Sequence, residues 1–272
     1  MNRRFSWFNA TSLTLGFAFL YVPMLILVIY SFNESKLVTV WAGFSTKWYG
    51  ELLGNDAFLS AAWVTLKVAL MSSTLAAVLG TMAAHVLVRG GRFMGRTLFS
   101  GMIYAPLVMP EVITGLSLLL LFISIGLDRG IFTIVLAHTT FTMCYVSVVV
   151  SSRLVTFDKS LEEAALDLGC TPLDAFFSVT LPIIAPAVIS GWLLAFTLSL
   201  DDLVIASFAA GPSATTLPMK IFSSVRLGVS PEINALSTIM ISIVTVGVII
   251  TSLLSKRAVA RQRADEQAAA RT

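Results

Sequence analysis

Long apolar segments separated by short polar connections dominate the pattern of this 272-residue chain. A helix needs about 20 residues to cross the hydrocarbon core of a bilayer. The segments that meet this length are 11–32, 60–88, 98–125, 131–152, 183–210 and 233–255. The pattern therefore predicts an all-α, polytopic bundle of six transmembrane helices, with residues 1–272 forming a single domain.

The composition agrees with a lipid environment. Hydrophobic residues make up 57% of the chain and charged residues only 12%, whereas a soluble domain carries about 25% charged residues. A net charge of +3 would suggest nucleic-acid binding in a soluble protein, but here the basic residues lie in short connections beside apolar segments. We therefore interpret them as topology signals and expect no nucleic-acid partner.

The distribution of basic residues predicts the orientation of the chain. If both termini are cytoplasmic, the basic residues on the inner side are Arg3, Arg4, Arg89, Arg92, Arg96, Arg153, Lys159, Lys256, Arg257, Arg261, Arg263 and Arg271. The outer side then holds Lys36, Lys47, Arg129, Lys220 and Arg226. The excess of basic residues on the inner side favours cytoplasmic termini under the positive-inside rule. We expect a multi-pass protein of the cell inner membrane.

The longest inner connection carries more carboxylates than any other. Residues 153–182 contain Asp158, Glu162, Glu163, Asp167 and Asp174. Ser160 and Glu163 match the capping-box pattern that begins a helix, and Gly169 suits the left-handed position that ends one. Thr171 and Pro172 suit the start of a second short helix. The pattern predicts two short helices joined at glycine, either as a docking surface or as a solvated connection.

A sequence signature lies inside this connection. Its residues are Glu163, Ala164, Ala165, Gly169, Val179, Leu181 and Pro182. Their spacing resembles the EAA signature of the inner-membrane permeases of binding-protein-dependent ABC importers, the MetI-like type I family, in which isoleucine is usual in place of Val179. The resemblance implies the type I permease fold. It also implies that the signature residues other than Val179 couple the chain to an ATPase subunit.

Other segments resemble the polyamine permeases of this family, first those for putrescine and then those for spermidine. These segments are 36–53, 105–122, 198–208 and 228–239. The resemblance implies a transport subunit without enzymatic activity, which binds no cofactor while ATP is bound by the partner. The implied partners are a homologous second permease, ATP-binding ABC subunits, a periplasmic polyamine-binding protein and the polyamine itself. The binding protein would dock on the outer loops 33–59 and 211–231.

Three acidic residues fall inside predicted spans, at Glu111, Asp201 and Asp202. An ionisable group at that depth is costly and should face a cavity or a partner. Pro106 and Pro110 predict a bent helix beside Glu111. Carboxylates could offset the desolvation of a polyamine's ammonium groups, so we expect these acids to line the substrate pathway. Pairing with Lys67, or with a basic residue of a companion subunit, is the alternative.

The two adjacent aspartates should not be equivalent. On an unbroken helix, Asp202 shares its face with the small residues Ala195, Ser199, Ala206 and Ala209. Such a face suits a pathway wall or a close helix contact. Asp201 shares its face with Leu194, Thr197, Val204 and Phe208, which suits a structural anchor. The pattern favours Asp202 over Asp201 in the pathway.

Other candidate chemistry is weak. Residues 90–97 resemble a phosphate loop, but Arg96 replaces the required lysine and no strand precedes the loop. His85 and His138 lack metal ligands at suitable spacing, so we expect interior histidines and no metal site. No nucleophile elbow is present, because Gly115-Leu116-Ser117-Leu118 is followed by leucine. An ion-coupled secondary transporter of small organic cations remains the alternative function.

Overall fold

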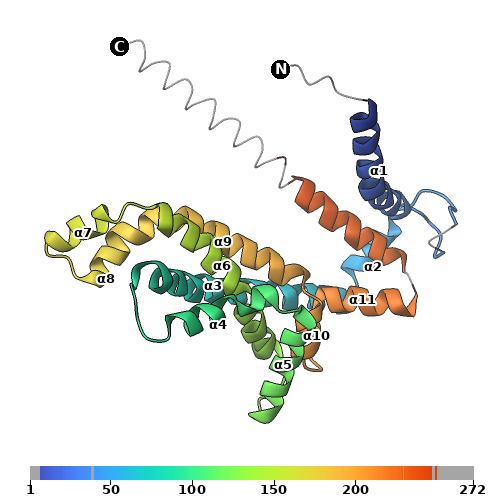
Figure 1. Cartoon of the computed structure of the whole chain (residues 1–272). Coiled ribbons are helices and arrows are strands. Elements are labelled where there is room, and N and C mark those ends of the chain that lie inside the picture. The colour runs from blue at the N-terminus through green and yellow to red at the C-terminus, as the bar shows by residue number, and fades with distance from the viewer. Residues whose placement is uncertain (1–6, 38–39, 229, 247–248, 250–272) are drawn as a thin grey trace. The chain divides into compact units, whose positions relative to one another are not determined.

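The computed structural model describes residues 7–37, 40–228, 230–246 and 249, which fold as helices joined by short connections (Figure 1). The helices of the first half are α1 (Trp7–Tyr30), α2 (Lys47–Leu53), α3 (Asp56–Arg89), α4 (Arg96–Val108), α5 (Glu111–Ser124) and α6 (Ile131–Thr156). Those of the second half are α7 (Ser160–Asp167), α8 (Pro172–Ala175), the π-helix η1 (Phe176–Thr180), α9 (Leu181–Asp201), α10 (Val204–Ala209), α11 (Leu217–Leu227) and an unlabelled helix, Pro231–Val246. The predicted all-α class is confirmed.

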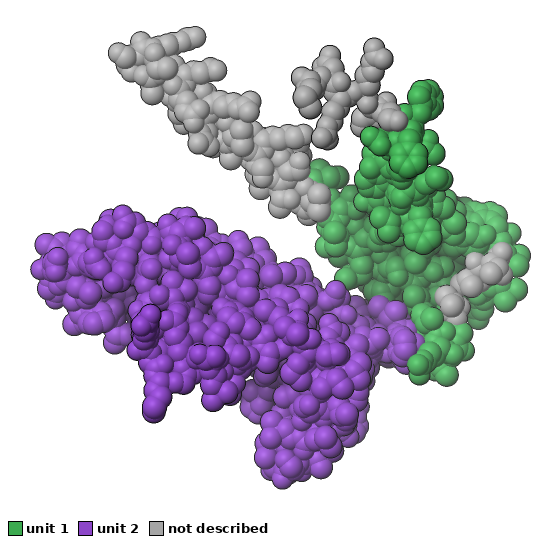
Figure 2. Space-filling model, viewed as in Figure 1, with its two compact units in different colours: residues 1–56, 224–272 green, residues 57–223 purple. Residues whose placement is uncertain are grey.

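The chain divides into two compact units, drawn in green and purple in Figure 2. The first contains residues 1–56 and 224–272, and the second contains residues 57–223. The second unit holds both the acidic connection and the three acidic residues of the predicted spans. It therefore contains every candidate site residue.

Four helices are long and apolar enough to cross a membrane: Trp7–Tyr30, Asp56–Arg89, Ile131–Thr156 and the continuous stretch Pro172–Asp201. A fifth crossing results if α4 and α5 count as one span, although the chain bends by 117° between them. The bend lies at Met109 and Pro110, beside Glu111, as the prolines predict. These helices are compatible with six spans without confirming that number.

The fifth predicted span differs from the observed helices, and the sixth is described only in part. The segment 183–210 is not one helix, because α9 ends at Asp201 and α10 begins at Val204. For the sixth predicted span, 233–255, the structure describes a helix as far as Val246. Its remaining residues lie outside the described part of the chain except for Ile249, as do Arg3, Arg4 and the basic residues from Lys256 onward.

Helix α6 is the centre of the second unit. It packs on α3 at Gly80, where an added Cβ would lie 2.7 Å from the carbonyl oxygen of Met143. It packs on α9 at Gly191, where a Cβ would lie 3.1 Å from a methyl group of Val146. Small residues allow such close approach between helices, and dispersion contacts then hold the bundle together without a hydrophobic driving force.

In the first unit, Asn33 organises the outer loop predicted to dock a partner. Its side-chain amide donates to the carbonyl of Val40 at 2.7 Å, and its backbone carbonyl accepts from the indole of Trp48 at 2.6 Å. Trp48 is consequently buried, whereas Trp41 and Phe44 are exposed. Trp41 and Phe44 therefore remain available to lipid or to a partner.

Candidate functional site

The acidic connection begins with a cap that differs from the predicted one. The Asp158 carboxylate accepts a hydrogen bond from the backbone N–H of Ser160 at 3.0 Å, whereas Ser160 forms no capping box with Glu163. The predicted box is wrong because an aspartate two residues earlier satisfies the same free N–H group. This backbone hydrogen bond, with a further contribution from the Ser160 hydroxyl, lowers the pKa of Asp158 below its ordinary value.

The turn between the two short helices has the predicted geometry. Gly169 adopts φ +90°, a left-handed conformation that residues with a Cβ rarely adopt. The hydroxyl of Thr171 then accepts from the backbone N–H of Asp174 at 3.2 Å and caps α8, with Pro172 in its first turn. The local sequence therefore determines where both short helices begin and end, through side-chain caps and the backbone angle of the glycine.

Glu162 fastens α7 to the rest of the unit. Its carboxylate lies 2.8 Å from Arg89 Nε at the end of α3, and it also accepts from the Thr180 hydroxyl at 2.7 Å. Arg89 donates in addition to the carbonyl of Phe157 at 3.2 Å. The sequence signature pointed instead to Glu163, which is exposed and forms an ion pair with Lys159 one turn away. It missed Glu162 and Arg89; an arginine ending a long apolar helix near a carboxylate-rich segment was the available signal.

The acidic connection also presents apolar side chains on its surface. Ala165 is buried and Leu181 half-buried, while Ala164 and Pro182 are exposed. The large exposed apolar residues are Leu161, Leu166, Leu168, Leu173 and Phe177. A connection that contacts only solvent does not need so many exposed apolar side chains, whereas an exposed apolar patch is typical of a protein interface. We call residues 158–182 the coupling segment.

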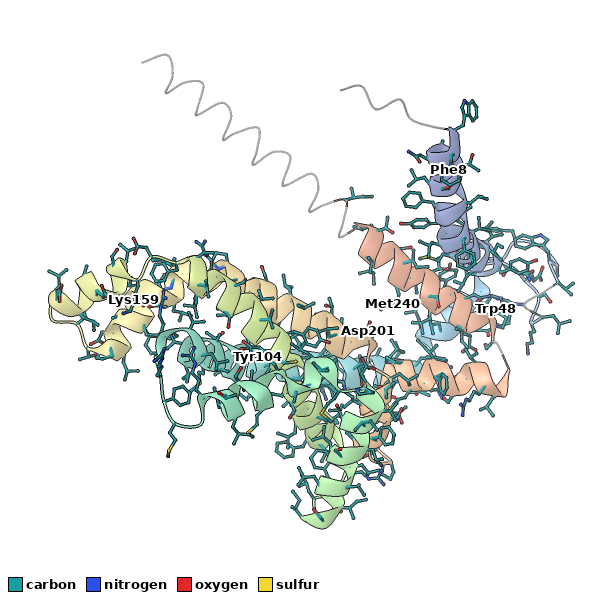
Figure 3. All side chains as sticks on the ribbon, viewed as in Figure 1. Phe8, Trp48, Tyr104, Lys159, Asp201 and Met240 are labelled. Carbon is teal, nitrogen blue, oxygen red and sulfur yellow. The ribbon has the colours of Figure 1, made fainter. Side chains whose placement is uncertain are left out.

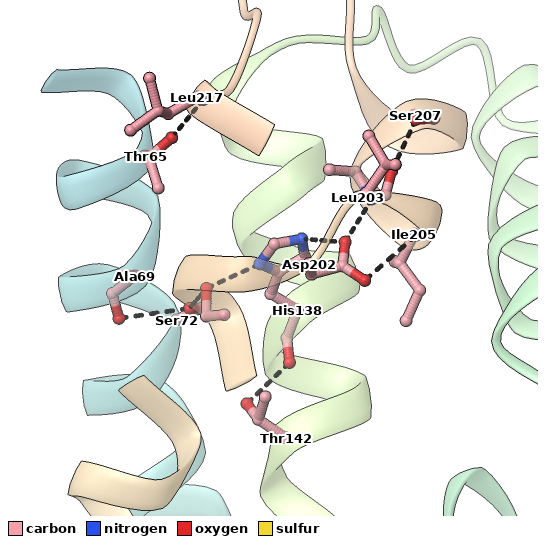
Figure 4. Close-up of polar contacts among 12 residues, drawn as sticks. Thr65, Ala69, Ser72, His138, Thr142, Asp202, Leu203, Ile205, Ser207 and Leu217 are labelled. Atoms are coloured by element: carbon pink, nitrogen blue, oxygen red, sulfur yellow. Dashed lines mark hydrogen bonds and ion pairs between the residues drawn. The ribbon is translucent and has the colours of Figure 1, made fainter. Parts of the chain in front are cut away.

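A second group of candidate residues surrounds the break between α9 and α10 (Figure 4). The Asp202 carboxylate accepts from the backbone N–H groups of Ile205 at 3.3 Å and Ala206 at 2.7 Å, so it caps α10. One of its oxygens lies 3.1 Å from His138 Nε2 on α6. Both side chains are almost fully buried. Asp202 therefore holds the start of α10 against α6.

Hydroxyl groups extend this contact across the bundle. His138 Nδ1 shares a hydrogen bond of 2.7 Å with the Ser199 hydroxyl on α9. Ser72 on α3 donates to the same hydroxyl at 3.0 Å. Four helices thus meet through one buried polar cluster, formed by Ser72, His138, Ser199 and Asp202. His138 is an interior histidine, as expected, but no sequence pattern indicated its carboxylate neighbour, which lies 64 positions away.

Asp201 and Glu111 are both exposed, unlike Asp202. Asp201 is the last residue of α9 (Figure 3), and Glu111 lies in the first turn of α5, where the helix dipole favours a negative charge. Within the described residues, neither carboxylate lies within 4.0 Å of a cation. Lys67, the proposed intrachain partner, instead lies 5.2 Å from the ring of Trp63.

The preference for Asp202 over Asp201 assumed an unbroken helix. Because the helix ends between them, the two side chains are not arranged as on a helical wheel. The small residues beside Asp202 pack against other helices: Ala195, Ala206 and Ala209 are buried. The structure thus gives Asp202 the anchoring position that the pattern assigned to Asp201, and the expected role of Asp202 in the substrate pathway stays a prediction.

Comparison with known proteins agrees with this architecture. Residues 76–264 match the family model described as binding-protein-dependent transport system inner membrane component. The putrescine transport system permease protein PotI of Escherichia coli K12 is 62% identical over 265 residues, covering 95% of this chain and 94% of the relative. The spermidine/putrescine permease protein PotC of the same strain is 43% identical over 244 residues, covering 90% and 92%.

Solved structures support the fold. A bacterial ABC transporter that imports alginate superposes with a TM-score of 0.69 at 18% identity, covering 91% of this chain and 94% of that one. An alginate transporter in complex with its periplasmic protein gives a TM-score of 0.65 at 18% identity, covering 89% and 90%. The predicted permease fold, the multi-pass inner-membrane location and the classification as a transport component rather than an enzyme are confirmed. The chain belongs to the family of binding-protein-dependent transport system inner membrane components.

Proposed function

We propose that this chain is one permease subunit of an ATP-driven importer of polyamines, with putrescine as the principal substrate. The observation that carries this proposal is the 62% identity with the putrescine permease PotI along nearly the whole of both chains. The 43% identity with PotC makes spermidine the second candidate. A homologous permease would supply the other half of the pathway, and a periplasmic polyamine-binding protein would deliver the substrate at the outer surface.

The coupling segment is the proposed contact with the ATPase. Its apolar side chains project from two short capped helices, and Glu162 ties it to α3 through Arg89. Movement of a docked ATPase would therefore reach the bundle through a fastened connection. The segment would lie on the cytoplasmic side, with ATP bound by the partner and not by this chain.

The exposed carboxylates are the proposed contacts with the substrate. A polyamine carries separated ammonium groups, and each loses its hydration inside a pathway. Glu111 and Asp201 have no cation within 4.0 Å in the described part of the chain, so both could pair with such groups. We assign Asp202 to the same proposed pathway. Its contacts in the cluster with His138 would position the neighbouring Asp201.

Uptake by the reconstituted complex tests the proposal. Proteoliposomes with the ATPase facing the lumen and ATP inside should accumulate labelled putrescine faster than spermidine when the binding protein is outside. Accumulation should persist when a protonophore collapses an imposed proton gradient and should stop without ATP. Uptake that needs no ATP and vanishes with the protonophore would establish the ion-coupled alternative instead.

A further inference from the structure

A pocket of about 390 Å³ lies where the ends of three helices meet in the second unit. Arg96, Ser100 and Tyr104 of α4 line one side of it, and Ser151 of α6 lines another. Tyr104 is labelled in Figure 3. Leu87 of α3 contributes to the apolar part of the lining. None of these residues belongs to the coupling segment or to the cluster around Asp202.

The polar groups of this pocket are not fully used within the chain. The Arg96 guanidinium donates to the carbonyls of Gly91 and Leu87, each at 2.6 Å, but it has five N–H donors. Within the described residues, no carboxylate lies within 4.0 Å of it. The Ser151 hydroxyl oxygen is buried without a hydrogen-bond partner. A buried unsatisfied hydroxyl is costly and usually has a partner of some kind.

The position of the pocket limits what that partner can be. Arg89, at the end of α3, contacts Glu162 of the coupling segment, so the pocket lies at the end of the bundle that bears this segment. There the apolar helices α3 and α6 end, and the connection 90–95, which contains Arg92 and is flanked by Arg89 and Arg96, begins. Where apolar spans end, a bilayer presents its lipid phosphate groups. Leu98 and Met102 of α4 are exposed nearby in the sequence and could contact acyl chains.

We propose that this pocket binds the phosphodiester group of an anionic phospholipid. The guanidinium supplies charge and directed donors, which suit a phosphate oxygen pair. The hydroxyls of Ser100, Tyr104 and Ser151 complete a neutral lining, and Ser151 gains the partner it lacks. Basic pockets between transmembrane helices on the cytoplasmic side are suited to anionic headgroups. The lipid would connect α3, α4 and α6 beside the moving coupling segment.

Lipid retention measures this binding without any transport assay. The complete transport complex is extracted in mild detergent, washed extensively, and its bound phospholipids are quantified by mass spectrometry. The wild type should retain phosphatidylglycerol or cardiolipin in preference to phosphatidylethanolamine. Arg96→Gln should lower the retained anionic lipid about tenfold and Ser151→Ala about threefold. Arg92→Gln is the matched control, since Arg92 is exposed in the same connection and does not line the pocket.

The possible outcomes separate the alternatives. Equal losses in Arg96→Gln and Arg92→Gln would indicate a diffuse basic surface and overturn the proposal, as would unchanged retention in Arg96→Gln. Displacement of the lipid by millimolar inorganic phosphate would indicate a site for the free anion and overturn it too. If Arg96→Gln fails to assemble, Ser151→Ala and Tyr104→Phe, which keep the backbone contacts of Arg96, decide the question. A complex that retains the lipid but imports no polyamine would refute only the proposed function.

Discussion

Asp201 and Asp202 are neighbours in sequence, yet their carboxylates have different surroundings. The Asp202 side chain is 5% exposed and accepts two backbone N–H groups beside His138, whereas Asp201 is exposed. Similar side chains one position apart thus fulfil different requirements. One satisfies the free N–H groups at a helix start, and the other remains available to a ligand or a companion subunit.

This difference predicts that alanine at position 202 lowers stability, whereas alanine at position 201 impairs uptake. Asp202→Ala should lower the free energy of unfolding by about 1–2 kcal/mol, because α10 loses its cap. Asp201→Ala should change stability by no more than about 0.5 kcal/mol, since it removes an exposed side chain, but it should raise the KM for polyamine uptake. Thermal unfolding of the purified complex and initial uptake rates measure the two effects. The assignment fails if Asp201→Ala is the destabilising change and leaves the KM unaltered.

At the scale of elements, Glu162 and Arg89 determine how firmly α7 is attached. Both side chains are only 13% exposed, and the carboxylate also accepts from Thr180. The pair formed by Lys159 and Glu163 is far more exposed, at 63% and 58%. The first pair should therefore stabilise the structure more than the second.

A double-mutant cycle tests this ranking. The substitutions Glu162→Gln and Arg89→Gln should show a coupling free energy of about 1–2 kcal/mol, because a charge-assisted hydrogen bond is lost. The control cycle, Glu163→Gln with Lys159→Gln, should give no more than about 0.5 kcal/mol. Hydrogen exchange of the α7 amides should accelerate only in the first set. Equal coupling in the two cycles would contradict the anchoring role of Glu162.

The turn at Gly169 gives a prediction about energy coupling. Gly169→Val should impair uptake more than ATP hydrolysis, because φ +90° costs a β-branched residue at least about 1–2 kcal/mol. An added Cβ would meet no neighbouring atom, so the effect would come from the backbone. Gly101→Val is the control, since Gly101 lies within α4 and also has open space around it. Wild-type uptake per ATP in Gly169→Val would exclude a coupling role for the turn.

Local sequence predicts helix ends and bends better than it predicts which side chains of other helices contact them. The bend at Pro110, the left-handed Gly169 and the Thr171 cap follow from the conformations and hydrogen bonds of single residues. The break after Asp201 was missed, because no proline or glycine marks it and the apolar pattern continues. Asp202 stabilises that break through α6, and a contact of this kind depends on packing that the sequence pattern does not contain.

At the scale of the whole molecule, apolar surface is abundant outside the packed core. Helix α1 has no buried residue, and exposed large apolar side chains are found on most other helices (Figure 3). In a bilayer this surface would contact lipid or the proposed second permease. The predicted fold agrees with the family at this scale, because the succession of apolar segments is visible directly in the sequence.

The cysteines allow the orientation of the chain to be measured. Cys170 is exposed in the coupling segment and Cys144 is buried in α6. A membrane-impermeant maleimide should label inside-out vesicles and not right-side-out vesicles, and Cys170→Ser should abolish the labelling. Docked ATPase should reduce the rate. Labelling of right-side-out vesicles alone would place the segment outside and refute the proposed ATPase contact.

The stretch Pro172–Asp201 is continuous over 30 residues, which corresponds to about 45 Å at ~1.5 Å per residue. It begins in the coupling segment and ends at the accessible Asp201. A helix of this length amplifies a small rotation, because a tilt of about 10° about one end would displace the other end by ~8 Å. Because Ser199 and Asp202 hold the Asp201 end against α6 through His138, the proposed ATPase contact would act on the far end of this helix, and a displacement of that size there would turn the end that carries Asp201 by only about 10°.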